Sequence, residues 1–210
     1  MGRTEDDPRN SVLSQLVESV KAISELPECR NMFRKMYGNF VRRVKLLSPL
    51  FEELRDSDKE LGDEEVAAFE SLGEALHSAK ELIKSVNQGS KLYQALEKDK
   101  IVDKFHQMTV KIEAALSKIP YENFDMSEEV CEQIELVHAQ FKRAKERTDA
   151  LDSQLEIDLA IAVRDKEPDA AIIKRLSEKL HLRTINDLKK ESLAFHELVY
   201  SKWRRSRGPV

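Results

Sequence analysis

Two Glu-x-x-His steps are the features of this chain whose residue types and spacing could do chemistry. They are Glu74 with His77 and Glu135 with His138, and the same spacing supplies ligands to di-iron centres in helical bundles. A helix turns by about 100° per residue, so Glu74 falls roughly opposite its apolar neighbours and Glu135 well away from those near it. Because the ligands of one metal centre must converge, we expect both carboxylates to face solvent and predict no metal site.

No other pattern of catalytic residues stands out. His106, His181 and His196 lie near no nucleophile pattern, and the sequence contains no GxSxG elbow, phosphate-binding loop or Gly-rich dinucleotide fingerprint. Cys29 and Cys131 belong to no CxxC or Cys/His cluster, so neither zinc nor a disulfide is indicated. We predict no catalytic residue, no metal and no cofactor for this chain.

The elements that carry these residues are predicted to be helices. One long apolar stripe recurs at alternating steps of four and three, a spacing that keeps one face of a helix apolar. Its members are Phe33, Tyr37, Phe40, Val44, Leu47, Phe51 and Leu54. Pro49 lacks an amide hydrogen and crowds the carbonyl four residues earlier, so we predict a bend or short break between about residues 45 and 49.

Similar stripes predict the rest of the fold. Further helices are expected at about 11–24, 66–86, 99–118, 154–163, 169–180 and 184–203, with one more after Ser127. Asp63 is expected to cap a helix that Gly89 ends. At 210 residues, 40% of them hydrophobic, the chain can bury a core as one domain. We predict an all-α fold, a four-helix bundle with additional C-terminal brace helices over residues 11–200, between a disordered tail (1–10) and a basic tail or linker (201–210).

The charge balance excludes some partners. The chain has 35 basic and 39 acidic residues and a formal charge of -4, which gives no case for nucleic acid as a partner. The N-terminus is acidic and lacks the apolar core of a signal peptide, and no segment approaches the roughly 20 apolar residues needed to span a bilayer. We expect a cytoplasmic location.

A basic helix face is the first candidate binding surface. No acidic residue occurs between Glu28 and Glu52. Four basic side chains of this stretch project roughly opposite the apolar stripe; they are Arg34, Lys35, Arg42 and Lys45. Such a face can attract an acidic protein or anionic lipid, and the alternative is an ordinary solvated face.

The segment QGSKLY (Gln88–Tyr93) is the second candidate surface, and the tail KWRRSR (Lys202–Arg207) adds a further basic cluster. Gln88, Ser90 and Lys91 are candidate docking residues. The alternative is a helix stop whose Leu92 and Tyr93 anchor the turn. The tail suits contact with a membrane surface or a linker role.

Six pieces of the sequence, in the right order, carry a resemblance to a known family. They are NFVRRVKLLSPLFEELR (Asn39–Arg55), QGSKLY, IPYE (Ile119–Glu122), IELVHAQFKRAK (Ile134–Lys145), KLHL (Lys179–Leu182) and ESLAFHELV (Glu191–Val199). Together they resemble the U-box N-terminal domain of plant U-box ubiquitin ligases of the armadillo-repeat class, over about residues 11–199. The resemblance implies a bundle similar to the HeLo-like four-helix bundles of plant helper immune receptors and of the necroptotic pseudokinase executioner.

The resemblance also implies a function. In such ligases ubiquitin transfer belongs to the U-box, which binds the ubiquitin-conjugating enzyme and is expected downstream of Val210, so this chain is expected to be no enzyme itself. The implied role is recruitment of substrates or regulators, such as receptor-like kinases or exocyst subunits, in plant immunity, cell death or development, at the plasma membrane or in the nucleus as well as in the cytoplasm. The alternative is a lipid-binding or oligomerising bundle of the cell-death-executioner type.

Overall fold

The described residues of the chain, 8–29, 31–56, 61–145, 153–165 and 167–206, are helical with short connections and contain no strand. The computed structural model thereby confirms the predicted all-α fold. The chain forms two compact units: unit 1 takes its described residues from 1–27, 36–84 and 103–148, and unit 2 from 28–35, 85–102 and 149–210. Residues 1–7 and 207–210 lie outside the described part, and with them most of the predicted N-terminal tail and part of the predicted C-terminal one; the first described helix begins at Pro8 and the last ends at Ser206.

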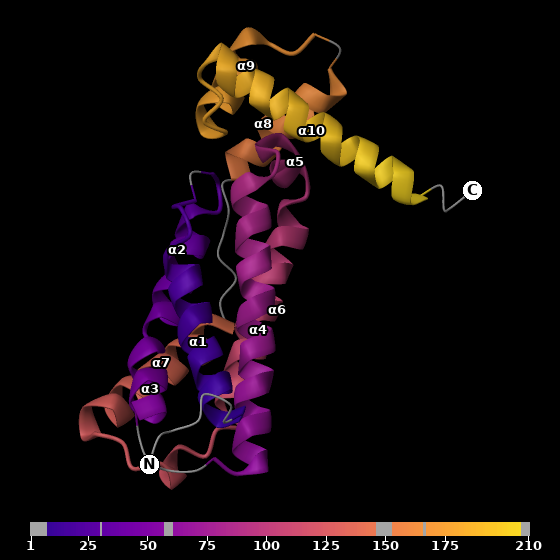
Figure 1. The fold of residues 1–210 in the computed structure, drawn as a ribbon. Coiled ribbons are helices and arrows are strands. Elements are labelled where there is room, and N and C mark those ends of the chain that lie inside the picture. The colour runs from indigo at the N-terminus through magenta and orange to yellow at the C-terminus, as the bar shows by residue number, and fades with distance from the viewer. Residues whose placement is uncertain (1–7, 30, 57–60, 146–152, 166, 207–210) are drawn as a thin grey trace. The chain divides into compact units, whose positions relative to one another are not determined.

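Unit 1 consists mainly of long helices that run beside one another (Figure 1). They are α1 (Pro8–Ser24), α3 (Ser48–Asp56), α7 (Glu128–Lys145) and the greater part of α2 (Arg34–Lys45), α4 (Asp63–Gln88) and α6 (Lys98–Leu116), with the short 3₁₀ helix η1 (Tyr121–Asn123) before α7. Every member of the predicted stripe from Phe33 to Leu54 is buried. The Phe40 ring packs edge-to-face against the rings of Phe105 and Phe141, with ring centroids 5.9 Å and 6.4 Å apart. Aromatic pairs prefer this arrangement.

The predicted break before Pro49 is confirmed. Helix α2 ends at Lys45 and α3 begins at Ser48. The amide of Leu46 is shared between the carbonyls of Arg42 (3.3 Å) and Arg43 (3.2 Å), the tightened geometry typical of a helix end. Proline cannot donate to the carbonyl four residues earlier, so the regular ladder stops here.

Acidic side chains accept hydrogen bonds from the backbone at the starts of α4 and α7. Asp63 is the first residue of α4 and does not precede it as predicted; instead Glu65 accepts a hydrogen bond from the Gly62 amide at 2.6 Å. Ser127 does precede α7, and its amide and hydroxyl both donate to the carboxylate of Glu53 on α3. This carboxylate therefore joins α3 to the start of α7.

Unit 2 has a small core of its own. It contains α5 (Lys91–Leu96), α8 (Ser153–Arg164), α9 (Ala170–Lys179) and α10 (Ile185–Ser206). Its buried residues are Ala95, Leu155, Leu159, Leu176 and Leu180. The sequence predicted α8, α9 and α10 but placed QGSKLY between two helices as a turn with an anchoring pair, and did not predict the short helix α5 that begins at Lys91.

Charged side chains fix the unit 2 helices. Asp158 of α8 is fully buried and binds Arg175 of α9 through Nη2 (2.8 Å) and Nε (3.1 Å). The hydrogen bonds from Arg175 hold the pKa of Asp158 below its ordinary value. Thr184 and Asp187 exchange hydrogen bonds at the start of α10, a reciprocal capping box.

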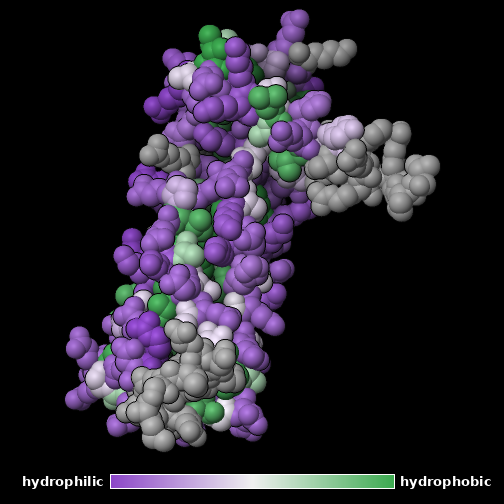
Figure 2. All heavy atoms as spheres, viewed as in Figure 1, coloured by the Kyte–Doolittle hydropathy of each residue, from purple (hydrophilic) through white to green (hydrophobic). Residues whose placement is uncertain are grey.

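The surface seen in Figure 2 is mostly hydrophilic, with apolar residues in separate patches. No helix in the described part of the chain is both long and apolar enough to cross a membrane.

Candidate functional site

The basic side chains of α2 face outward. Arg34, Lys35, Arg42 and Lys45 are all exposed, while Tyr37, Phe40 and Val44 on the other side of the same helix are buried. The predicted direction of the basic face is therefore confirmed. Its use as a binding surface stays a prediction.

Unit 2 brings two of the predicted site residues, Arg34 and Lys91, close to a histidine. The Lys91 ammonium donates a hydrogen bond to the backbone carbonyl of His181 at 3.3 Å. Burial lowers the pKa of His181 first, and the positive charges of Lys91, Arg183 and Arg34 lower it further. These four residues, which we call the cationic cluster, come from three distant parts of the chain. The nearby acid Asp187 is held by Thr184.

His181 has an unusual backbone conformation. Its φ is 54°, and it is the one non-glycine residue with positive φ in the described chain. The amide of His181 donates to the Glu178 carbonyl (3.2 Å) and that of Leu182 to the Ser177 carbonyl (2.7 Å), which is the Schellman pattern at a helix end. Glycine usually fills this position because it has no Cβ, so the imidazole is held there at a cost in backbone energy.

Ser90 is buried and serves the fold. It caps α5, its hydroxyl accepting from the Tyr93 amide at 3.0 Å and donating to Glu191 at 2.5 Å. The two oxygens of Glu191 also accept from the amides of Leu92 (2.8 Å) and Lys91 (3.0 Å). The Ser90 hydroxyl is thus out of a partner's reach in this structure, whereas Gln88 is exposed and Lys91 partly so.

Glu191 is a residue that the sequence analysis missed. It lies in ESLAFHELV and binds QGSKLY about a hundred residues earlier, so two of the pieces that carry the family resemblance meet in space. A carboxylate at a helix N-terminus satisfies amides that lack a partner inside the helix. The serine of QGSKLY was a sign of such a cap, but nothing local pointed to its acidic partner.

The Glu-x-x-His steps do not converge. Glu74 and Glu135 are exposed as expected, and His77 is exposed too; the described residues contain no group of three or more His, Cys, Asp or Glu that could hold a metal ion. His138 instead meets Ser117, with Nε2 2.9 Å from the hydroxyl oxygen, and Glu113 at 3.8 Å.

The arrangement of Ser117, His138 and Glu113 is not a catalytic triad. In a triad the base uses one ring nitrogen for the nucleophile and the other for the carboxylate. Here the hydroxyl and the carboxylate both approach Nε2. The Ser117 hydroxyl also donates to the Glu113 backbone carbonyl at 2.9 Å, so its proton has a structural partner.

The two cysteines are free thiols, Cys29 buried and Cys131 half-buried. The Cys29 thiol donates to the Asn31 side-chain oxygen at 2.7 Å, and burial raises the pKa of the Cys29 thiol. A thiol with a raised pKa is a poor nucleophile at neutral pH. Cys29 therefore packs and donates a hydrogen bond in unit 2.

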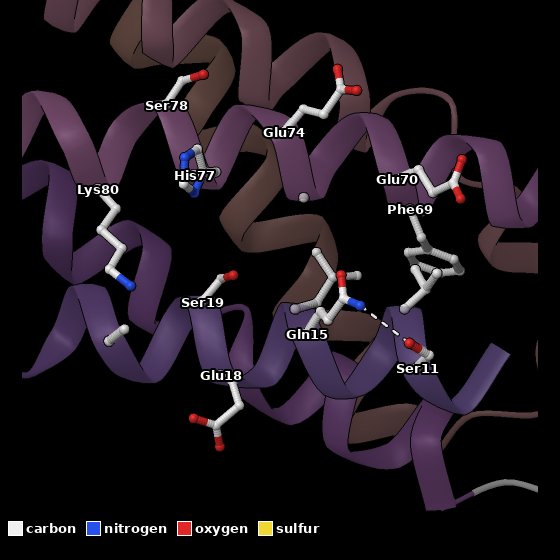
Figure 3. A pocket seen from close by; sticks show the side chains of 14 residues that line it. Ser11, Gln15, Glu18, Ser19, Phe69, Glu70, Glu74, His77, Ser78 and Lys80 are labelled. Carbon is white, nitrogen blue, oxygen red and sulfur yellow. Dashed lines mark hydrogen bonds between the residues drawn. The ribbon is translucent and has the colours of Figure 1, made fainter. Parts of the chain in front are cut away.

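A groove of about 1140 Å³ lies between α1 and α4 in unit 1. In Figure 3 Ser19 and Gln15 of α1 point toward α4, and Lys80 of α4 points toward α1. Glu18 lies on the α1 rim, and Glu70 and Glu74 lie on the α4 rim. All three glutamates are exposed, so the groove opens to solvent between acidic edges.

These observations define a class: an all-helical domain that offers charged surfaces and a groove, with no catalytic constellation among its described residues. Residues 34–145 match the family model described as "PUB10-like, N-terminal domain". The chain belongs to this family, the N-terminal domains of plant U-box proteins.

Relatives of known name agree with that assignment. The chain is 51% identical to "U-box domain-containing protein 14" of Arabidopsis thaliana over 201 residues, which cover 96% of this chain and 32% of the relative. It is 47% identical to "E3 ubiquitin-protein ligase SPL11" of Oryza sativa subsp. japonica over 180 residues, 83% of this chain and 26% of the relative. The chain thus spans a third or less of these relatives. No solved structure matches it, so the HeLo-like subtype of bundle stays a prediction.

Proposed function

We propose that this chain is the recruiting domain of a U-box ubiquitin ligase, which binds a substrate or regulator through its basic surface. The observation that carries the proposal is the exposure of Arg34, Lys35, Arg42 and Lys45 on a helix whose apolar face is buried. Exposed charge of one sign steers association with an acidic partner. The cationic cluster extends the same chemistry to Lys91 and Arg183.

In this mechanism the domain supplies position and the rest of the ligase supplies catalysis. A protein held by the basic surface is brought near a ubiquitin-conjugating enzyme, which a U-box elsewhere on the longer polypeptide binds. The proposed partners are acidic surfaces of signalling proteins, such as receptor-like kinases or exocyst subunits, in immunity or cell death. The proposed locations are the cytoplasm, the plasma membrane and the nucleus.

A second candidate function is binding to an anionic membrane surface. The cationic cluster favours it, since basic side chains near such a surface contribute about 1 kcal/mol each. The burial of α1 argues against the version in which this helix detaches and inserts. Leu13, Leu16, Val20 and Ile23 are each at most 1% exposed, and releasing them would expose core surface to water.

The test reverses the four α2 charges together and measures binding to receptor-like kinase domains, to exocyst subunits and to liposomes containing anionic lipid, across a salt series. The variant is Arg34→Glu, Lys35→Glu, Arg42→Glu and Lys45→Glu. The matched control reverses four exposed lysines elsewhere, at Lys104, Lys111, Lys118 and Lys142. Salt-sensitive binding that only the α2 reversal weakens, by tenfold or more, supports the proposal. Equal binding by both variants overturns the α2 surface, and binding to liposomes alone favours the membrane function.

A further inference from the structure

The groove between α1 and α4 has the size and lining of a peptide site. Its volume of about 1140 Å³ exceeds the range of roughly 300–1,000 Å³ typical of small-molecule pockets, which are also mostly apolar and enclosed. Its accessible apolar lining is Val12 and Ala22, both half-buried, above the core residues Leu16 and Phe69, which are at most 1% exposed. The walls are polar and exposed. A groove between two helices with an apolar base is a common receptor for a third helix.

Small side chains leave room for the backbone of an incoming helix. Ser19, Ala22, Gly73 and Ser78 line the groove on its two walls. Gly73 lies in the middle of a 26-residue helix, where glycine costs helix stability relative to alanine. A Cβ added there meets nothing closer than the Leu16 Cδ2 atom at 3.7 Å, an ordinary contact. Packing within the described chain thus does not require this glycine, and the close approach of another backbone would.

The rims of the groove are acidic on both sides. Glu18 of α1 points away from α4 and Glu74 of α4 points away from α1 (Figure 3), so with Glu70 they lie along the outer edges of the groove. From Asp63 to Ser78, α4 contains no lysine or arginine, and the first basic residue on that wall is Lys80. An occupant therefore meets glutamates at the outer edges of the groove, the half-buried Val12 and Ala22 beneath it, and the cation of Lys80, which points toward α1.

Charge complementarity selects the occupant. The first seven residues of this chain contain three acidic residues and one arginine, so their charge matches that of the rims and does not complement it. A second copy docked by this same face would place like charges opposite each other. We infer that the groove binds a basic amphipathic helix of a partner protein, with a stripe of small and apolar residues flanked by Lys or Arg on both sides. The inference rests on the proposed interaction function and adds to it a second surface of opposite charge.

The test is a selection from a library of 18-residue helical peptides. Every peptide carries Ala, Ser or Leu at i, i+4, i+7 and i+11, and its flanking positions vary among Lys, Arg, Gln and Glu. The 210-residue protein serves as bait, and the variant Gly73→Leu, whose side chain enters the groove, serves for counter-selection. We expect wild-type-specific binders with basic flanks. Enriched flanks that are neutral or acidic, or no binder that distinguishes the wild type from Gly73→Leu, would overturn the inference.

Two further variants guard against misfolding and against unspecific charge effects. The triple variant Glu18→Gln, Glu70→Gln and Glu74→Gln changes exposed side chains only and should weaken the selected peptides at least tenfold. Gly38→Ala on α2, where an added Cβ has nothing within 4 Å, should leave peptide affinity unchanged. Peptide binding that falls in the triple variant but not in Gly73→Leu would be unspecific attraction and would also overturn the inference. The α2 charge reversal separates the proposals, because it should not affect these peptides.

Discussion

At the residue scale, the carboxylate of Glu191 holds three donors at once. They are the Ser90 hydroxyl and the amides of Lys91 and Leu92. We expect Glu191→Ala to lower the free energy of unfolding by about 2 kcal/mol, because these donors lose a charged acceptor in a partly buried place. Urea unfolding gives the loss, and faster hydrogen exchange at the amides of Lys91 and Leu92 locates it.

The control for this prediction is Glu197→Ala on the same helix. Glu197 is exposed, so its removal should change stability by less than about 0.5 kcal/mol. If both variants unfold at the same urea concentration as the wild type, the carboxylate contributes nothing to the docking of α10 on α5.

A substitution at His181 is expected to raise stability, the opposite of the effect at Glu191. A residue with a Cβ pays a steric cost at a φ of 54° that glycine avoids. We expect His181→Gly to stabilise the protein by roughly 1 kcal/mol, measured by urea unfolding. His181→Ala keeps a Cβ and should bring no such gain. A loss of stability in His181→Gly would mean that the imidazole contributes more contact energy than its backbone position costs.

At the element scale, two glycines, one inside α2 and one directly after α4, predict opposite effects of the same substitution. A Cβ on Gly89 would lie 2.9 Å from the Ser85 carbonyl oxygen and 2.7 Å from Gln94 Nε2, so the end of α4 would have to shift. We expect Gly89→Ala to destabilise by about 1–3 kcal/mol, the usual range for overpacking. Gly38→Ala adds a Cβ to open space inside α2 and should stabilise by about 1 kcal/mol.

Thermal unfolding of both variants checks this pair. Melting temperatures that move in the same direction would contradict the geometric argument, because the new methyl group meets open space at Gly38 and close neighbours at Gly89.

Helices could be predicted where local information determines them. The stripe from Phe33 to Leu54 carries its own periodicity, and Pro49 acts on the carbonyl four residues before it, so α2, α3 and their break follow from the sequence. Helix α5 has only six residues, too few for a periodic stripe, and Glu191 reaches its N-terminus from about a hundred residues away. A local pattern cannot reveal such a partner.

The same limit applies to the candidate site. The exposure of Arg34 and Lys35 follows from their angle to the stripe. Their position near Lys91, His181 and Arg183 depends on how unit 2 folds. The burial of Glu113 and Asp158 was not predicted. Charged residues are rarely buried without a partner, so burial could be predicted only from the partners. Their partners, His138 and Arg175, lie on other helices.

At the scale of the whole molecule, the small net charge of -4 conceals separate surfaces of opposite sign. The α2 face and the cationic cluster are basic, and the rims of the groove are acidic. A net charge near zero predicts little about partners when the charges are segregated, because steering depends on the local field at each surface. Added salt should therefore weaken the binding of an acidic partner at the α2 face and the binding of a basic partner at the glutamates of the groove.

The titratable groups of unit 2 predict that the free energy of unfolding decreases as the pH falls. The pKa of His181 is lowered by burial and by nearby cations, so the unfolded chain takes up its proton first, and stability declines as pH falls below about 6.5. The pKa values of Asp158 and Asp187 are lowered mainly by hydrogen bonds from Arg175 and Thr184. Their contribution is present above about pH 4 and is lost as pH falls through their depressed values. All three groups act in the same direction.

Hydrogen exchange of α8 and α9 amides between pH 7 and pH 3, corrected for the intrinsic effect of pH on exchange, measures this loss. We expect protection to fall in two stages, near pH 6 and below pH 4. His181→Gln should remove the first stage and keep the second. Asp158→Asn should weaken protection already at pH 7, because Arg175 loses its charged partner, and should flatten the second stage. Protection that stays constant down to pH 4 in the wild type would show that His181 titrates alike in the folded and unfolded chains.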